Sequence, residues 1–177
     1  MDGAITDIVV DAVSIERRVA ELGREISAHY AGRSLVVVGV LTGAVVFVAD
    51  LMRQISVPME LDFVATSSYG RATRTSGEVR LLKDLSHPVL GRHLLLVEDI
   101  VDTGLTLHYL VQTFGARQPA SVATCALLDK PARRAQPVTL DYRGFEIDDH
   151  FVVGYGLDHA GLYRNLPYVG MLAPMKP

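Results

Sequence analysis

Residues 94–107 read LLLVEDIVDTGLTL, and this stretch decides the fold. Its first four residues are aliphatic, and such a run predicts a buried strand. Glu98, Asp99 and Asp102 follow, and after them come apolar residues with the spacing of one helical face, as far as Gly115. The stretch therefore predicts a strand, an acidic loop and a helix. Because open α/β sheets bind ligands beyond the carboxyl ends of their strands, these three carboxylates are expected at a ligand site.

The alternation of strand and helix patterns continues on both sides of this stretch. Residues 14–30 carry apolar side chains at helical spacing, with Ser14 as the expected N-cap and Gly32 as the stop. A second helix is predicted at residues 44–54. Such alternation predicts an α/β domain with a mainly parallel sheet flanked by helices, and the length suits a single domain over residues 1–177. The other predicted strands are residues 35–40, 59–67, 79–82, 121–128, 138–142 and 150–153.

The composition narrows the class of protein. A hydrophobic content of 49% and a charged content of 21% are typical of globular proteins. The net charge of −3 indicates no general affinity for nucleic acid or for an anionic membrane. Cys125 is the single cysteine, so no disulfide framework exists and a reducing cytoplasm is expected. The N-terminus lacks the pattern of a signal peptide, and the uncharged residues 34–49 are too short to span a membrane.

The acidic loop has the composition of a site for a phosphorylated sugar. Adjacent side chains diverge at a strand end, so Glu98 and Asp99 suit two sugar hydroxyls, or a metal ion and a hydroxyl. The hydroxyls of Thr103 and Thr106 and the N–H groups around Gly104 suit an anion at the start of a helix. The lysine and spacing of a nucleoside-triphosphate P-loop are absent. Carboxylates beside a phosphate cradle imply Mg²⁺; the plainer interpretation is a solvated acidic turn that caps a helix.

The motif VEDIVDTGLTL at residues 97–107 resembles the phosphoribosylpyrophosphate (PRPP) binding motif of the type I phosphoribosyltransferases. Its two acids followed by Asp-Thr-Gly are similar to the 6-oxopurine (hypoxanthine-guanine) branch. The resemblance covers nearly the whole chain and implies the type I phosphoribosyltransferase fold, with a core of about residues 14–130 and a hood made mainly of residues 131–177 and the N-terminal residues. The other matching segments are GVLTGA at 39–44, SSYG at 67–70, SGEV at 76–79, LLDKP at 127–131, FVVGYGLD at 151–158 and YRNLPY at 163–168.

The resemblance implies a purine salvage enzyme. Such an enzyme transfers the 5-phosphoribosyl group of PRPP to hypoxanthine and/or guanine, releases pyrophosphate and forms IMP or GMP. The family's Asp-Thr-Gly aspartate implies that Asp102 is the general base at nitrogen 7 of the purine, where burial would help it accept the proton. The residues implied at the ribose and the 5-phosphate are Glu98, Asp99, Asp102, Thr103, Gly104, Leu105 and Thr106.

Further residues are implied at the purine, at pyrophosphate and in a mobile lid. Lys130 would contact the 6-oxo group, Phe151 would stack on the ring and the backbone of Val152 would read the base edge. On their own, Phe151 would be a core residue, Lys130 and Arg164 solvated charges and Asp158 a turn residue. Asp158 would join the purine side and bind a Mg²⁺ that also holds pyrophosphate. The implied pyrophosphate residues are Leu41, Thr42, Gly43 and Arg164, the lid residues Ser68 and Tyr69, and the metal ligands Glu98, Asp99 and Asp158.

The chain departs from the family pattern at Thr42. Residues 41–43 read Leu-Thr-Gly, where the family usually has Leu-Lys-Gly in a loop with a non-proline cis peptide. Thr42 keeps a backbone contact to pyrophosphate but supplies no charge, so weaker affinity for PRPP or pyrophosphate is expected. Whether the Leu41–Thr42 bond is cis is left open by the sequence.

Two other functions remain as alternatives. A xanthine- or guanine-preferring relative would share these motifs, because base preference depends on backbone geometry that the sequence does not reveal. A regulator that keeps the fold and binds RNA would need a coherent basic face, whereas the arginines here are dispersed and the net charge is negative. Neither a nucleic acid nor a membrane is expected as a partner, and the family implies a homodimer or homotetramer.

Overall fold

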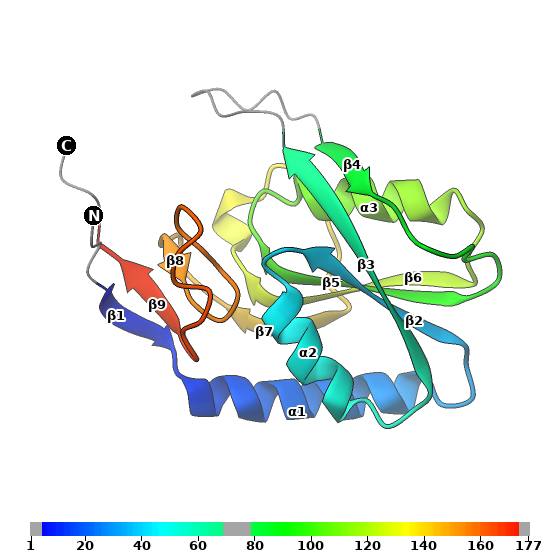
Figure 1. The fold of residues 1–177 in the computed structure, drawn as a ribbon, viewed down its shortest axis with the longest axis horizontal. Helices are drawn as coiled ribbons and strands as arrows, with labels where there is room; N and C mark the ends of the chain where they lie inside the picture. The colour runs from blue at the N-terminus through cyan, green and yellow to red at the C-terminus, as the bar shows by residue number, and fades with distance from the viewer. Residues whose placement is uncertain (1–4, 69–78, 174–177) are drawn as a thin grey trace.

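The computed structural model describes residues 5–68 and 79–173, and a six-stranded sheet forms the centre of this part of the chain (Figure 1). The strands lie in the order β4-β3-β2-β5-β6-β7, with β3, β2, β5, β6 and β7 parallel and β4 antiparallel at one edge. The mainly parallel α/β sheet expected from the sequence is confirmed. The bounds are β2 Leu35–Leu41, β3 Met59–Ser68, β4 Val79–Lys83, β5 His93–Val101, β6 Ser121–Asp129 and β7 Tyr142–Glu146.

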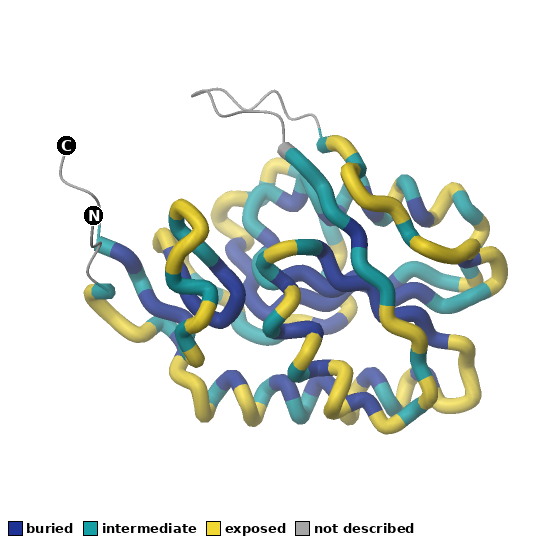
Figure 2. Tube along the Cα trace, viewed as in Figure 1, coloured by how far each residue is buried: buried dark blue, intermediate teal, exposed yellow. Residues whose placement is uncertain are grey.

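Helices cover both faces of this sheet. Helices α1 (Ala12–His29) and α2 (Val45–Gln54) share one hydrophobic cluster with Leu95 and Val97 of β5. Helix α3 (Leu105–Gly115) shares the other cluster with Leu94 and Leu96. Successive residues of β5 are thus buried on opposite faces, which is why its sequence shows an unbroken apolar run (Figure 2).

Helix α1 begins earlier than the sequence pattern predicted. The Asp11 side chain accepts a hydrogen bond from the Ser14 backbone N–H at 2.9 Å, so Asp11 is the N-cap and the prediction of Ser14 was wrong. An aspartate caps a helix as well as a serine, and Ser14 lies in the first turn instead.

Strand β5 continues through the first acidic residues instead of ending at Val97. Its ladder with β6 pairs Glu98 with Ala126 and Ile100 with Leu128, so the loop starts only at Asp102. The strand predicted at residues 138–142 was also wrong, since β7 starts at Tyr142. Residues before it are held as a loop, in which the Thr124 hydroxyl donates to the Thr139 carbonyl at 2.7 Å.

A second, small sheet joins the two ends of the described chain. Its strands are β1 (Ile5–Val10), β9 (Val169–Leu172) and β8 (Val152–Val153), in the order β1-β9-β8 and antiparallel. We call this sheet, with the loops between β8 and β9, the hood. Of the residues 131–177 expected there, β7 belongs to the main sheet instead, because it pairs with β6. The hood lies beside the carboxyl end of β2, where its Gly156 packs against Gly43 (Figure 1).

In the two described ranges, no helix is both long enough and apolar enough to cross a membrane.

Candidate active site

The carboxyl ends of β2 and β5 bring the acidic residues next to residues 41–43. The two strands are parallel neighbours, with Gly39 paired to Val97. A Cβ atom on Gly43 would lie 1.7 Å from the Asp99 Oδ2 atom, so only glycine lets this carboxylate approach the loop. The residues implied at the ribose and at pyrophosphate are therefore in direct contact.

The two adjacent carboxylates of β5 lie in a poorly solvated position. Glu98 is only 7% exposed, and burial followed by the charge of Asp99 raises the pKa of Glu98 well above its ordinary value. Burial also raises the pKa of Asp99 to about 6, although a hydrogen bond from the Ile100 backbone N–H at 2.9 Å opposes this. Two buried acids side by side favour a cation or hydroxyl donors between them and the solvent.

The start of α3 forms a hollow of about 100 Å³ beside Glu98. Gly104 has a φ of +80°, and a Cβ atom there would lie 2.8 Å from the Gln136 carbonyl oxygen, so the tight turn requires glycine. The segment after β6 braces this loop, because the Ala135 and Gln136 N–H groups both donate to the Thr103 carbonyl, at 2.9 and 3.0 Å. The residues that line the hollow are Glu98, Ile100, Val101, Asp102, Thr103, Gly104, Thr106 and Leu107.

The hollow has the properties of an anion site. The first turn of α3 contains no acidic residue, and its N-cap is Gly104, which has no side chain to cap the helix. The Leu105 N–H donates a long hydrogen bond of 3.4 Å to the Thr103 hydroxyl. Unpaired N–H groups and the positive end of the helix dipole attract a phosphate. Of the residues implied at the 5-phosphate, Leu105 is the one that does not line this hollow.

Asp102 also lines this hollow, and although its Oδ1 atom is buried, the side chain as a whole is not. Its side chain is 39% exposed, and its Oδ1 atom lies 3.0 Å from the Arg133 Nε atom. Arg133 also lies 3.5 Å from the Asp149 Oδ1 atom, and Arg134 donates to the Asp102 carbonyl at 3.0 Å. No role was expected for Arg133 from the sequence. The available signal was its position three residues after Lys130, because Lys130 caps the short helix (Pro131–Arg133) that Arg133 ends.

Lys130 and Phe151 both differ from the plain interpretations of their residue types. Lys130 is only 6% exposed; its Nζ atom donates to the His150 carbonyl and lies 3.9 Å from the Asp149 carboxylate. Phe151 is 55% exposed, with its ring edge-on to His159 at 5.4 Å between centroids. A buried lysine and an exposed phenylalanine next to each other are the reverse of the usual pattern and suit a planar ligand with a polar edge. Val152, which follows, is buried in β8.

The hood completes the side of the site that faces residues 41–43. Arg164 forms an ion pair with Asp158 at 2.7 Å and donates to the Gly156 carbonyl at 2.5 Å, so neither charge is simply solvated. Both are near enough to Asp99 to act on its pKa, Arg164 lowering it and Asp158 raising it. The Leu41–Thr42 peptide bond is cis, which answers the question that the sequence left open, and Thr42 is exposed.

The implied metal ligands do not form a preformed cage. Across residues 5–68 and 79–173, no cluster of three or more His, Cys, Asp or Glu side chains could hold a metal ion. Mg²⁺ commonly binds through one or two carboxylates together with substrate phosphates and water, so Glu98, Asp99 and Asp158 still fit a Mg²⁺ that arrives with a phosphorylated ligand. Of the implied lid residues, Ser68 ends β3 and Tyr69 lies outside the described residues.

A parallel sheet with a carboxylate pair, a helix-start anion cradle and a hood is the architecture of a phosphoribosyltransferase, and sequence comparison agrees. The phosphoribosyl transferase domain family matches residues 6–160, so the chain belongs to this family. Within it, the hypoxanthine-guanine phosphoribosyltransferase of Bacillus subtilis is 47% identical over 170 residues, which cover 96% of this chain and 94% of the relative.

Two further comparisons point to the same branch. A solved hypoxanthine phosphoribosyltransferase of Staphylococcus aureus superposes with a TM-score of 0.92 and 39% identity, covering 96% of this chain and 92% of that one. The bifunctional protein TilS/HprT of Listeria innocua is 48% identical over 98% of this chain, which spans only 27% of that longer protein.

Proposed function

We propose that the protein is a hypoxanthine-guanine phosphoribosyltransferase of purine salvage. It transfers the 5-phosphoribosyl group of PRPP to hypoxanthine and/or guanine, releasing pyrophosphate and forming IMP or GMP. The observation that carries the proposal is the grouping of residues at the carboxyl ends of the parallel strands. Glu98 lines the hollow at the start of α3, and Asp99 lies against Gly43. Buried Lys130, at the end of β6, contacts the segment that carries the exposed Phe151. The names of the relatives support the class of base.

On the PRPP side, Glu98 and Asp99 hold the two ribose hydroxyls, and residues 102–106 bind the 5-phosphate. Pyrophosphate lies against residues 41–43 and Arg164, where the hood meets the main sheet. Asp158, Glu98 and Asp99 would hold a Mg²⁺ that arrives with PRPP, and this ion would supply positive charge next to the leaving pyrophosphate. Breaking the bond between the ribose and the pyrophosphate of PRPP leaves positive charge on the sugar. The adjacent carboxylates stabilise this charge.

On the purine side, Lys130 donates to the 6-oxo group, Phe151 stacks on the ring, and Val152 presents its backbone to the base edge. Asp102 accepts the proton from nitrogen 7. The ion pair with Arg133 holds the Asp102 carboxylate at the edge of the crevice before the base arrives. Because Arg133 also contacts Asp149, which lies near Lys130, the proton acceptor and the 6-oxo donor belong to one charged network.

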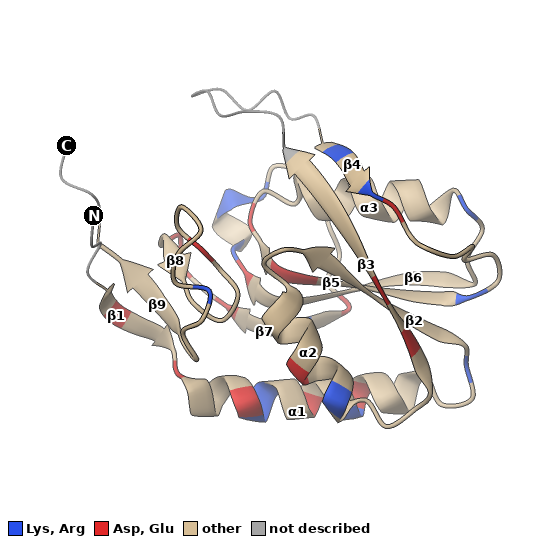
Figure 3. Cartoon of the chain, in the orientation of Figure 1, with Lys and Arg blue, Asp and Glu red and all other residues tan. Residues whose placement is uncertain are grey.

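The structure favours an enzyme over an RNA-binding regulator. The Lys and Arg residues of the described part of the chain are spread over α1, α2, β4 and the segment after β6, rather than gathered on one element (Figure 3). An RNA site would require a coherent basic surface. A preference for xanthine is a second outcome that the assay below separates. We further propose that the enzyme acts in the cytoplasm as a homodimer or homotetramer.

The direct test is product identification. The protein is incubated with PRPP, Mg²⁺ and each of hypoxanthine, guanine, xanthine and adenine, and nucleoside monophosphates are identified by mass. We expect IMP and GMP, and no AMP. A nucleotide from none of the four bases would contradict the proposed function. Asp102→Ala is expected to lose about 10²- to 10⁴-fold in kcat while it still binds PRPP, whereas Asp148→Asn, at an exposed position outside the crevice, keeps its activity.

A further inference from the structure

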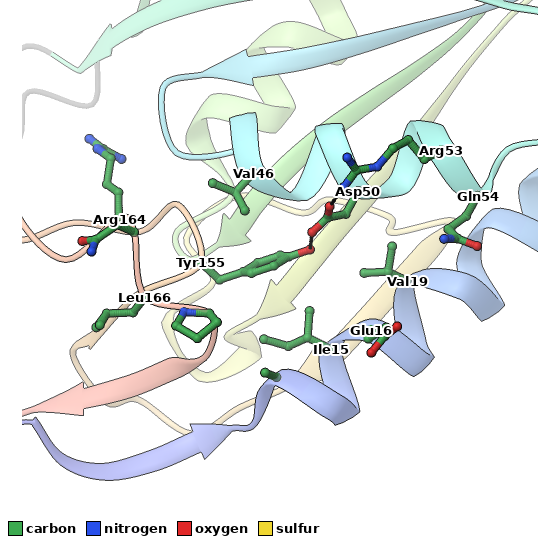
Figure 4. Close-up of a pocket in the computed structure, with 13 residues that line it drawn as sticks. Ile15, Glu16, Val19, Val46, Asp50, Arg53, Gln54, Tyr155, Arg164 and Leu166 are labelled. Carbon is green, nitrogen blue, oxygen red and sulfur yellow. Dashed lines mark hydrogen bonds and ion pairs between the residues drawn. The ribbon is translucent and has the colours of Figure 1, made fainter.

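A cavity of about 460 Å³ lies between α1, α2 and the hood, and Tyr155 and Arg164 are among the residues that line it (Figure 4). Tyr155 is 6% exposed, and its hydroxyl donates to the Asp50 Oδ2 atom of α2 at 2.6 Å. Burial, and after it the hydrogen bond to Asp50, raise the pKa of Tyr155 above its ordinary value, so the hydroxyl stays a donor at neutral pH. One side-chain hydrogen bond thus joins the hood to α2.

The backbone of Tyr155 belongs to the turn that carries the pyrophosphate side of the hood. Tyr155 has a φ of +50°, and its N–H donates to the Leu166 carbonyl at 2.9 Å. The next residue, Gly156, donates to the Arg164 carbonyl at 3.0 Å and accepts from the Arg164 guanidinium. The location of Tyr155 therefore determines where Arg164 lies.

The same turn touches residues 41–43 directly. A Cβ atom on Gly156 would lie 2.1 Å from the Gly43 carbonyl oxygen, so the two backbones are in contact. Residues 41–43 lead straight into α2, where the Val45 N–H donates to the Thr42 carbonyl at 3.2 Å, and Asp50 lies further along that helix. Both ends of the Tyr155–Asp50 bond are consequently on segments that carry proposed pyrophosphate-binding groups.

We propose that Tyr155 is a positioning residue: its hydrogen bond to Asp50 fixes the hood turn of Arg164 against the loop of residues 41–43. This inference rests on the proposed function, in which these two segments hold the pyrophosphate of PRPP. It predicts a selective effect, because the purine side of the hood contacts Lys130 through the separate segment at His150. Loss of this hydrogen bond should weaken the binding of PRPP and of pyrophosphate and leave the binding of the purine base unchanged.

The test compares steady-state kinetics of Tyr155→Phe with the wild type. Since a part-buried hydrogen bond to the Asp50 carboxylate is lost, the KM for PRPP and the Kd for pyrophosphate are expected to rise about five- to tenfold. The KM for hypoxanthine should stay within about twofold and kcat within about threefold.

Two Asp50 variants separate positioning from packing. Asp50→Asn keeps an oxygen acceptor and is expected to behave like the wild type. Asp50→Ala should reproduce Tyr155→Phe, and the double variant should be no worse than either single one. Tyr142→Phe controls for the loss of a buried tyrosine hydroxyl by itself, because the Tyr142 hydroxyl on β7 has no hydrogen-bond partner among the described residues. It is expected to leave both KM values unchanged.

The outcomes are separable from those of the proposed function. A KM for PRPP that stays constant in Tyr155→Phe, or KM values for both substrates that rise together, would overturn the inference. If the wild type makes no nucleotide, the proposed function fails by itself. Amide hydrogen exchange then decides the positioning role without any substrate: faster exchange of the Gly156 and Val45 N–H groups in Tyr155→Phe supports it, and unchanged exchange refutes it.

Discussion

Replacing Asp99 by asparagine is expected to stabilise the metal-free protein while it abolishes tight PRPP binding. Burial raises the pKa of Asp99 to about 6 from the ordinary value of 3.8. At about 1.4 kcal/mol for each pKa unit, ionising this carboxyl costs the folded state about 3 kcal/mol at neutral pH. Because the side chain is partly exposed, this value is the upper limit of the gain.

The sign of the pH dependence follows from linkage. Below pH 3.8 the carboxyl is neutral in both the folded and the unfolded chain, so it contributes no penalty. Between pH 3.8 and about 6 the folded protein retains a proton that the unfolded chain has released, so the stability falls as the pH rises. Above about pH 6 the folded wild type bears the full cost of ionising Asp99. Asp99→Asn has no carboxyl to ionise at this position and avoids that cost.

The assay is urea unfolding of both proteins from pH 4 to 8 in the presence of a chelator. The free energy of unfolding of Asp99→Asn minus that of the wild type should increase from pH 4 to about pH 6 and then level off. Asp11→Asn supplies a control of opposite sign, since hydrogen bonds from the Ser14 N–H and hydroxyl lower the pKa of Asp11. The stabilising contribution of Asp11 is full above pH 3.8 and is lost only below it. Asp11→Asn should therefore be less stable than the wild type by an amount that stays nearly constant from pH 4 to 8. A difference for Asp99→Asn that is constant with pH would refute the reasoning.

Three further substitutions test separate parts of the crevice. Gly104→Ala places a side chain at φ +80° and 2.8 Å from the Gln136 oxygen. It should lower the free energy of unfolding in urea by at least about 1 to 2 kcal/mol and raise the KM for PRPP. An unchanged KM would contradict phosphate binding at the start of α3. Phe151→Ala removes an exposed ring, so its Tm should stay near that of the wild type. The KM for hypoxanthine should rise at least about fivefold, because the ring no longer stacks on the base. A large decrease in Tm would show that the ring stabilises the fold instead. Thr42→Lys adds a cation at an exposed position beside the cis bond. One screened charge pair is worth about 1 kcal/mol, so the KM for PRPP should fall about fivefold. An unchanged KM would show that the backbone of residues 41–43 alone decides the affinity for PRPP.

The elements with strong periodicity could be predicted from the sequence. The apolar runs of β2, β5 and β6 and the helical face of α1 are local patterns, and each is where it was expected. Strand β5 ends later than predicted because its pairing with β6 outweighs the low strand propensity of Glu98 and Asp99. The first strand of the hood could not be identified, because β1 becomes a strand only by pairing with β9 at the other end of the chain.

The sequence could name candidate residues for the site, but it could not predict the contacts between them. The acidic motif and its family resemblance pointed to Glu98, Asp99 and Asp102, but nothing local shows that Asp99 reaches Gly43 or that Arg133 pairs with Asp102. Those contacts join segments that are distant in the sequence. The cis bond at Thr42 was likewise beyond local patterns, since a non-proline cis peptide has no propensity signal.

The strand order of the hood has a consequence for folding during synthesis. Strand β9 lies between β1 and β8, so it is the partner of both, yet it follows both in the chain. Domains can begin to fold as they leave the ribosome. The main sheet can therefore assemble before β9 is synthesised, while β1 still has no strand partner. The purine end of the crevice is therefore the last part to form, and a chain terminated before Val169 would have a folded core without a closed site.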